Sequence, residues 1–432
     1  MVINICKKIF IFGLIFFYAL SPIFNAIPID PVWIISIVIL VILLNSRKAI
    51  LDLKRDYHYV IIWYLIFQCY CLIFPFSMYL CEPDIWKGDV FNTLFRPSRI
   101  ILTFIGGYGI VLLYKKIYHD SFFEAILRDL ILVFVFNGVI IFIESDNFAF
   151  SELLKSFFYK EEIQSGEEER ISGLFVQSGA ITSICQSFCS LFLPYLFVYR
   201  RMNVFLFIIS FVILLFSSIF AGRTGFLIII PFALLLILFA RSHLSALLLI
   251  SIAIPAIIIF FFYLPYLVEN SGNSVVQYNL MRLNLLYSYF GMEGANYDDP
   301  TIDIIFKHLN LPDNFFMLIF GNVGFKSNSY LKVSDMGYNI ILCKYGIIGF
   351  IIYYYFIVSS LWRFLTKKSY YFYVNNKDLF YLVVVFLLTF VFLELKEQVI
   401  YSRCCLAIFS LVLIACNLKN KKYDISGKNL LA

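Results

Sequence analysis

The sequence predicts an all-α polytopic membrane protein with about twelve transmembrane helices, forming a single integral membrane domain over residues 1–432. Of these residues 62% are hydrophobic and only 14% are charged, and the mean hydropathy is +0.87. A soluble globular domain of this size carries far more charge. Apolar runs of about 15 to 25 residues recur along the chain, and an α-helix of about that length crosses a bilayer core of about 30 Å.

The predicted spans are apolar runs separated by polar connections, at residues 9–26, 31–44, 59–80, 100–114, 126–143, 174–198, 203–220, 225–240, 244–267, 338–361, 379–395 and 402–416. The first run begins with Lys7 and Lys8, as a signal peptide would. No small-x-small cleavage site follows it, so we expect it to be retained as a span. The ten cysteines lie mostly inside apolar runs without a CxxC pair, which predicts small buried residues rather than a disulfide framework or a metal site.

The distribution of charge orients these spans. If the N-terminus is cytoplasmic, one set of connections carries twenty of the 34 basic residues but only seven of the 28 acidic residues. The positive-inside rule then places both termini in the cytoplasm. The net charge of +6 needs no nucleic-acid partner, because topology and contact with anionic membrane lipids explain the inner basic residues.

The long connections lie on the predicted outer face, at residues 81–99, 144–173 and 268–337. The last of these, between spans 9 and 10, is too long for a simple linker, and we expect it to fold as a lid or binding element. Within it, residues 311–325 are rich in Phe, Leu and Ile, which predicts an amphipathic helix at the membrane interface.

Three arginines on the predicted outer face are candidates for anion binding: Arg170 in "RISGLF", Arg223 in "FAGRTGFL" and Arg282 in "VVQYNLMRLNLLYSY". The positive-inside rule disfavours arginine on this face, and a guanidinium group pairs bidentately with carboxylate or with the phosphates of lipid-linked diphosphates. Structural roles are the alternatives. Arg170 has acidic neighbours at Glu167–Glu169, flanking glycines make a tight turn at Arg223, and Arg282 suits the solvated face of an amphipathic helix.

A second group of candidates lies in the late spans. Ser334 and Asp335 precede span 338–361 as possible N-caps, and Lys344 would lie about 10 Å into this helix. Its side chain would tilt back toward the outer face and line the floor of an outward-facing cavity. Glu394 and Glu397 end the next span, where we expect them to share a helix face; a structural ion-pair network is favoured there over a general base.

Several motifs of soluble-substrate enzymes are absent from the sequence: Walker A, GxSxG, HExxH and a cytoplasmic DxD-like pair. His308 is the only histidine in a predicted outer connection. We therefore expect no metal and no cofactor, and a lipid-linked donor reached from outside rather than a soluble nucleotide sugar.

With about twelve spans, long outer loops before the sixth and tenth, and the motifs "RISGLF", "FAGRTGFL" and "SDMGYNIILCKYGIIGFI", the chain resembles the bacterial O-antigen polymerases (Wzy-type), whose superfamily also contains the O-antigen ligases. The resemblance implies a GT-C-like glycosyltransferase of the inner membrane that acts at the periplasmic face. It would transfer the growing glycan from undecaprenyl diphosphate to an incoming lipid-linked repeat unit. Ligases typically carry a His-Asn pair where this chain has Ser334 and Asp335, which favours the polymerase.

The resemblance and the chemistry together assign the site residues. Diphosphate is a leaving group whose negative charge grows as the glycosidic bond breaks, and prepositioned cations stabilise it. The expected groups are Arg170, Arg223, Arg282 and Lys344 for diphosphate, Asp335 and then Glu394 as the base, and Tyr278, Tyr287 and Tyr338 for sugar rings. The expected partners are the undecaprenyl-diphosphate-linked oligosaccharide, membrane lipids and a chain-length regulator.

Other membrane functions remain as alternatives to the polymerase. An O-antigen ligase belongs to the same superfamily. A flippase for the lipid-linked oligosaccharide would have a similar number of spans, but we would expect short outer loops and two halves that echo each other. A small-solute transporter would need broken helices at the midplane and more charges within its spans.

Overall fold

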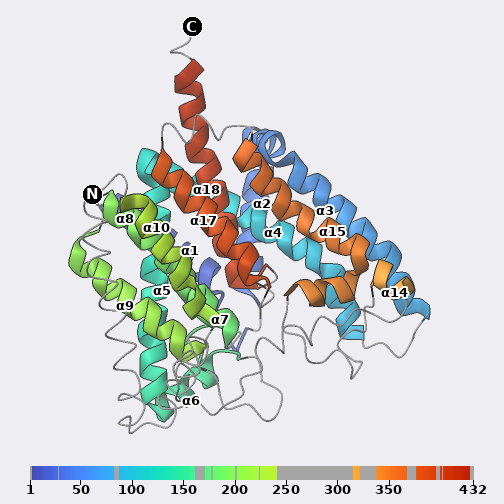
Figure 1. Cartoon of the computed structure of the whole chain (residues 1–432), viewed down its shortest axis with the longest axis horizontal. Helices are drawn as coiled ribbons and strands as arrows, with labels where there is room; N and C mark the ends of the chain where they lie inside the picture. Colours follow the sequence, from blue (N-terminus) through green and yellow to red (C-terminus); the bar gives the residue numbers. More distant parts are fainter. Residues whose placement is uncertain are drawn as a thin grey trace.

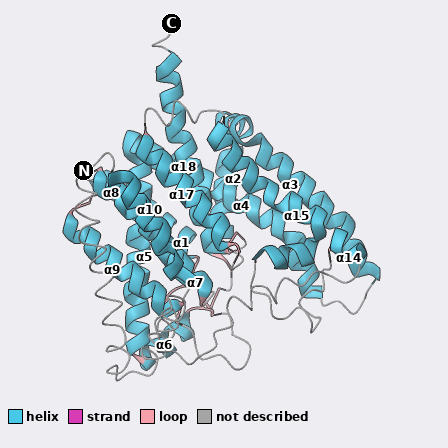
Figure 2. Cartoon of the chain, viewed as in Figure 1, coloured by secondary structure: helices cyan, strands magenta, loops and turns pink. Residues whose placement is uncertain are grey.

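The protein is described here by a computed structural model, which defines residues 2–27, 29–81, 87–160, 171–176, 179–199, 202–222, 224–240, 315–321, 337–366, 376–395, 399–400 and 402–428. Figures 1 and 2 show that this part of the chain is almost entirely helical. Within it, extended pairing is limited to isolated bridges from Phe24 to Ile27 and to Phe158.

The helices follow the order of the predicted spans. They are α1 (Val2–Leu20), α2 (Pro31–Leu44), α3 (Arg47–Cys81), α4 (Lys87–Tyr118), α5 (Phe122–Asp146), α6 (Phe148–Phe157), α7 (Ala180–Phe188), α8 (Leu193–Val198), α9 (Val204–Ala221), α10 (Ile229–Ala240), α14 (Phe315–Phe320), α15 (Gly337–Thr366), α17 (Lys377–Leu393) and α18 (Arg403–Lys428). Three short 3₁₀ turns connect them: η1 (His119–Ser121), η2 (Cys189–Phe192) and η3 (Thr224–Ile228).

Polar caps begin several of these apolar helices. The Asp30 carboxylate accepts a hydrogen bond from the Val32 amide at 2.9 Å at the start of α2, where Pro31 occupies the first turn. The Asn203 side chain accepts from the Leu206 amide at 2.7 Å at the start of α9. These caps satisfy backbone donors that a membrane interior would leave unpaired.

The described residues include five helical segments that are long and apolar enough to cross a membrane, namely Arg47–Phe74, Thr93–Ser145, Ala180–Val198, Val204–Ala221 and Gly337–Ser360. Shorter apolar helices cover Pro31–Leu44 and Ile229–Ala240. The chain is therefore an α-helical membrane protein. Predicted span 244–267 lies outside the described residues, and the count of twelve crossings and the GT-C-like class stay predictions.

Helix α18 lies in the core of the bundle. Its side chains are all buried from Cys404 to Cys416, and it packs against α1, α4, α5, α7 and α17. Helices α2 and α4 also approach closely, because α4 presents glycines to α2: a Cβ on Gly109 would lie 2.1 Å from Ile39 Cγ2. Small residues at such contacts are how membrane helices gain packing energy without a hydrophobic difference from lipid.

Two predicted spans are interrupted. Residues 174–176 were expected to start span 174–198, but they belong to a non-helical segment, 171–176, and helix begins only at Ala180. Helix α15 is broken at Gly346, whose φ of +65° lies outside the helical region. Gly321, at the end of α14, packs closely against the backbone at this break, since a Cβ on Gly321 would lie 2.3 Å from the Lys344 carbonyl oxygen. Neither interruption is predicted by the hydropathy of the sequence.

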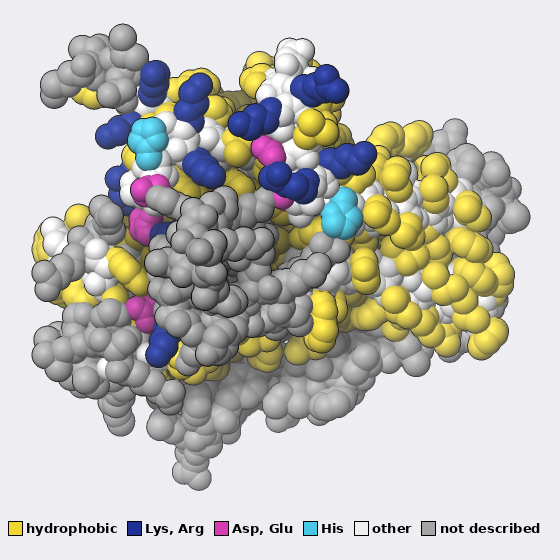
Figure 3. All heavy atoms as spheres, turned by 90° about the horizontal axis from the view of Figure 1, so that it is seen from above, with side chains coloured by type: hydrophobic (Ala, Val, Ile, Leu, Met, Phe, Trp, Pro, Cys, Tyr) yellow, Lys and Arg dark blue, Asp and Glu magenta, His cyan; other side chains and the backbone are white. Residues whose placement is uncertain are grey.

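The start of α1 and the end of α18 lie at the same end of the bundle (Figure 1). Lys and Arg side chains gather on this end, which Figure 3 shows from above. By the positive-inside rule, we predict that this end faces the cytoplasm. At the opposite end, the Asn25 amide donates to the Phe157 carbonyl at 3.0 Å, and Arg403 pairs with Asp30 at 3.3 Å. Predicted outer connections therefore contact the outer ends of predicted spans.

Candidate functional site

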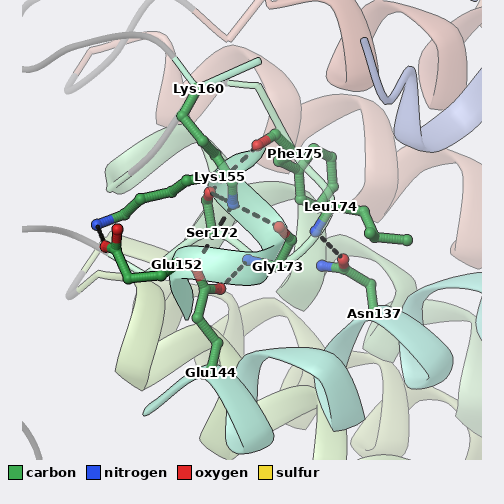
Figure 4. Close-up of polar contacts among 9 residues, drawn as sticks. All are labelled: Asn137, Glu144, Glu152, Lys155, Lys160, Ser172, Gly173, Leu174 and Phe175. Carbon is green, nitrogen blue, oxygen red and sulfur yellow. Dashed lines mark hydrogen bonds and ion pairs between the residues drawn. The ribbon is translucent and has the colours of Figure 1, made fainter. Parts of the chain in front are cut away.

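The segment directly after Arg170 is held against α5 by a buried polar cluster (Figure 4). The Gly173 amide donates to Glu144 Oε2 at 2.6 Å, and the Leu174 amide donates to Asn137 Oδ1 at 2.8 Å. Lys160 completes this group. We call Asn137, Glu144, Lys160, Ser172 and Gly173 the α5 cluster.

Lys160 connects Glu144 of α5 to the turn at Ser172 and Gly173. Its ammonium group lies 3.5 Å from Glu144 Oε1, donates to Ser172 Oγ at 2.6 Å and donates to the Gly173 carbonyl. The side chains of Lys160 and Glu144 are only 18% and 4% exposed, so this is a buried ion pair. Burial lowers the pKa of Lys160, while the Glu144 carboxylate acts in the opposite direction. The pair fixes a segment that has no helix or sheet of its own.

Local geometry explains why the segment needs glycine. Gly173 has a φ of +62°, the left-handed region that costs other residues energy. A Cβ there would also lie 2.5 Å from Asn137 Oδ1, the atom that accepts the Leu174 amide. Ile171, Leu174 and Phe175 are buried around this turn. Residues 171–175, "ISGLF", therefore form a tight, packed turn rather than the first turn of a helix.

The residues on both sides of Arg223 are held by α7. Ser183 Oγ donates to the Gly222 carbonyl and accepts from the Gly225 amide at 2.9 Å. A Cβ on Gly225 would lie 2.3 Å from the Ser183 carbonyl oxygen, and one on Gly222 would lie 3.0 Å from the Gly179 carbonyl carbon. Both glycines therefore serve close packing on α7, which agrees with the tight turn expected from the sequence.

The two turns approach the same end of α5. Gly173 is bonded to Glu144 near the end of α5, and the ring of Phe142 on α5 lies 5.4 Å from that of Phe220, just before Gly222. Gly179, which follows the Gly173 turn, contacts Gly222. Arg170 and Arg223 themselves lie outside the described residues, as do Arg282, Asp335, Tyr278 and Tyr287.

Glu394 is the best defined of the predicted site residues. It is fully buried and lies in the turn directly after α17, which ends at Leu393. Glu397 lies outside the described residues, so the shared helix face stays a prediction. Its Oε1 accepts from the Tyr354 hydroxyl at 2.9 Å and its Oε2 accepts from the Ile400 amide at 2.9 Å. With both oxygens engaged, Glu394 orders the turn from α17 to α18.

Arg96 on α4 is a buried cation that the sequence analysis missed. It is 2% exposed, its guanidinium lies 5.6 Å from the ring centroid of Tyr345, and its charge acts on the Glu394 carboxylate. Arg96 precedes a span on the predicted outer side, so the criterion that selected Arg170 and Arg223 would also have selected it. We call Arg96, Tyr338, Tyr354 and Glu394 the Glu394 cluster.

Lys344 and Tyr338 both lie on α15. Lys344 is 4% exposed, in the turn directly before the break at Gly346. The Tyr338 ring lies 4.9 Å from that of Tyr354, and its hydroxyl donates to the Val391 carbonyl at 2.8 Å. The hydroxyl of Tyr338 is thus hydrogen-bonded to the backbone of α17. Its partly buried ring is the part that could stack on a sugar.

An apolar pocket of about 480 Å³ lies between α2, α3 and α4. It is lined by residues such as Leu40, Tyr57, Ile61, Ile101 and Phe104, which suit hydrocarbon rather than a charged ligand. Among the described residues, no group of three or more His, Cys, Asp or Glu side chains is placed to hold a metal ion.

No family model matches the chain, and no curated protein matches it. The resemblance to O-antigen polymerases therefore depends on the arrangement of spans and loops and on the short motifs that carry the arginines.

Proposed function

We propose that this protein is a membrane glycosyltransferase that polymerises O-antigen or a related surface polysaccharide. It would transfer the growing glycan from undecaprenyl diphosphate to an incoming lipid-linked repeat unit at the periplasmic face of the bacterial inner membrane. The observation that carries the proposal is the fixed position of the turns next to Arg170 and Arg223. Both turns, distant in sequence, are anchored by buried polar groups around the same end of α5.

The anchoring supports anion binding for a physical reason. A cation stabilises a leaving diphosphate only if it is positioned before the reaction, because reorganising it would cost free energy as the bond breaks. Glycine turns held by a buried ion pair and by Ser183 provide a fixed backbone directly after Arg170 and on both sides of Arg223. Proximity to the end of a membrane helix suits a substrate whose isoprenoid chain stays in the bilayer.

The proposed chemistry is a single glycosyl transfer. A hydroxyl of the incoming repeat unit forms the new bond to the anomeric carbon of the donor, and the diphosphate leaves with the bonding electrons. Asp335 is the proposed base that takes the hydroxyl proton. Glu394, the second candidate in the sequence analysis, suits a structural role better because the Tyr354 hydroxyl and the Ile400 amide occupy its oxygens.

The test replaces Arg170 and Arg223 by Ala, separately and together, in the source strain with its own gene deleted. Surface polysaccharide is separated on a gel. We expect single repeat units to reach the surface while long chains disappear, and Arg223→Lys to restore chains only in part, because lysine lacks the bidentate fork. Lys155→Ala is the control, since Lys155 pairs on the surface with Glu152 at 3.0 Å and should not affect chain length.

Other outcomes would identify other functions. Complete loss of export would favour a flippase, and long chains that remain unattached to lipid A core would favour a ligase. Unchanged chain length in the double variant would refute the assigned role of both arginines. Immunoblotting of membranes checks that each variant is present at the wild-type level.

Transport of a lipid-linked oligosaccharide or another charged solute is the second candidate, because α15 is broken. Discontinuous helices and buried charges mark the binding sites of many transporters. The break at Gly346 lies next to buried Lys344, and Arg96 is buried nearby against Tyr345. The export assay separates this candidate from the polymerase, because a transporter variant loses export of single repeat units as well as long chains.

A further inference from the structure

We infer that Cys185 and Cys405 form a disulfide bond that joins α7 to α18. The two Sγ atoms lie 3.0 Å apart and both side chains are fully buried. A disulfide has an S–S distance of about 2.05 Å, so the two sulfur atoms need to approach by only about 1 Å to form the bond.

Neighbouring cysteines favour this pair over others. Cys404 also contacts Cys185, but its thiol donates to the Leu20 carbonyl at 3.4 Å. Cys189, the first residue of η2 directly after α7, is fully buried near Cys405. Cys185 and Cys405 are therefore the pair whose sulfur atoms already face each other.

The position of the pair in the chain supports oxidation. Cys405 lies in the first turn of α18, next to Arg403, which pairs with Asp30 at the end of the bundle that we predict to be outer. Disulfides form in the periplasm and other oxidising compartments. Formation of the disulfide therefore requires the predicted orientation, in which this end of the bundle faces the periplasm. The disulfide is expected whether or not the protein is a glycosyltransferase.

The bond forms by exchange with the disulfide of a thiol oxidase of that compartment. One thiolate of the protein attacks the oxidase disulfide, and the second thiolate then attacks the mixed disulfide. The two cysteines lose two protons and two electrons, and the oxidase leaves as a dithiol. Exchange takes place during folding, before α7 and α18 pack and bury the two thiols.

A disulfide here would stabilise the region near Arg223. Cys185 lies on α7 close to Ser183, which holds the backbone of Gly222 and Gly225. The bond would close a loop of 220 residues between α7 and the core helix α18. It would therefore keep the anchor of the Arg223 turn fixed relative to the centre of the bundle.

The test counts free thiols in the full-length protein. Membranes are dissolved in SDS with a maleimide reagent, with or without prior reduction, and the labels are counted by mass spectrometry. The chain has ten cysteines, so the disulfide leaves eight labels without reductant and ten with it. Cys185→Ser should give nine labels in both conditions, because Cys405 is then free.

Cys71→Ser is the matched control, since Cys71 is a fully buried cysteine on another helix. This variant should give seven labels without reductant and nine with it. Ten labels on the unreduced wild-type protein would overturn the inference. A cross-linked peptide that joins Cys185 to Cys404 or Cys189, rather than to Cys405, would overturn it as well.

Discussion

The buried ion pair of the α5 cluster gives the sharpest prediction, through the substitution Lys160→Met. Methionine removes the ammonium group that contacts Glu144, Ser172 and Gly173 but keeps a long apolar side chain. Glu144 then remains 4% exposed with the Gly173 amide as its donor. Removing one partner of a buried ion pair costs about 3–5 kcal/mol. We take the lower end, about 3 kcal/mol, because Lys160 retains some contact with solvent.

The assay is hydrogen exchange of the purified protein in detergent, followed on the peptide that contains residues 171–176. The amides of Gly173 and Leu174 donate to Glu144 and Asn137, so their exchange reports opening of this turn. At about 1.4 kcal/mol per tenfold change, a loss of about 3 kcal/mol predicts roughly 100-fold faster exchange. Lys155→Met is the control, because its pair with Glu152 is exposed and contributes little.

The double substitution Glu144→Gln with Lys160→Met separates charge from packing. It removes the buried charge that the single variant leaves unpaired, so exchange should return part of the way to the wild-type rate. Unchanged exchange in Lys160→Met would refute the reasoning, because some other contact would then hold the turn after Arg170.

Three further predictions follow from the same contacts. Gly173→Ala should destabilise the turn by at least about 1–2 kcal/mol from its φ of +62° alone, whereas Gly13→Ala, which meets nothing within 4 Å, should leave thermal stability unchanged or raise it. Tyr354→Phe removes the hydrogen bond to Oε1 of the buried Glu394 carboxylate, so it should lower the free energy of unfolding by about 1.5–3 kcal/mol, measured by thermal denaturation. A neutral result would mean that Oε1 has a second donor. Because burial lowers the folded-state pKa of Lys160, keeping this group charged costs folding free energy, and the cost disappears as pH rises from the lowered value to 10.5. The neutral amine can still donate hydrogen bonds to Ser172 and Gly173, which methionine cannot. Wild type should therefore gain stability relative to Lys160→Met as pH rises through this alkaline range, and parallel stability curves would contradict this.

Hydropathy was sufficient to place most helices. The apolar runs at 31–44 and 203–220 coincide with α2 and α9 almost to the residue, because Asp30 and Asn203 cap helices whose apolar sequence then continues without interruption. Length and hydropathy are properties of a single segment, so a sequence gives them directly.

The interruptions could not be located in this way, because they depend on contacts between distant residues. The residues "GLFV" at 173–176 are apolar enough to belong to a span. Their amides at Gly173 and Leu174 instead donate hydrogen bonds to Glu144 and Asn137 on α5. Gly346 breaks α15 where the backbone of Gly321 packs against it. Glycine at both positions was a visible signal, but glycine is also common inside intact membrane helices, so it did not identify the breaks.

Some buried polar residues near the candidate site were predicted from the sequence and others were not, because burial also depends on contacts between distant residues. Glu394 was selected because charge at the end of an apolar run is conspicuous, and its burial could not be read from the sequence. Arg96 was overlooked, although it has the same kind of position as Arg170. Asn137 lies in the middle of a predicted span. Only the structure shows that its Oδ1 accepts a hydrogen bond from the Leu174 amide and so holds the turn.

Several of the buried polar groups described above form hydrogen bonds with backbone that has left helical geometry. A backbone that leaves helical geometry inside a membrane protein must find partners for its amides and carbonyls within the protein. The Gly173 turn has Glu144, the break in α15 has the Tyr70 hydroxyl 2.5 Å from the Tyr345 carbonyl, and the turn after α17 has Glu394. Because each of these groups already stabilises an irregular segment, loss of activity on replacing one of them would not identify a catalytic residue. Substitution of an arginine carried by such a turn is more informative, since the turn itself keeps its anchors.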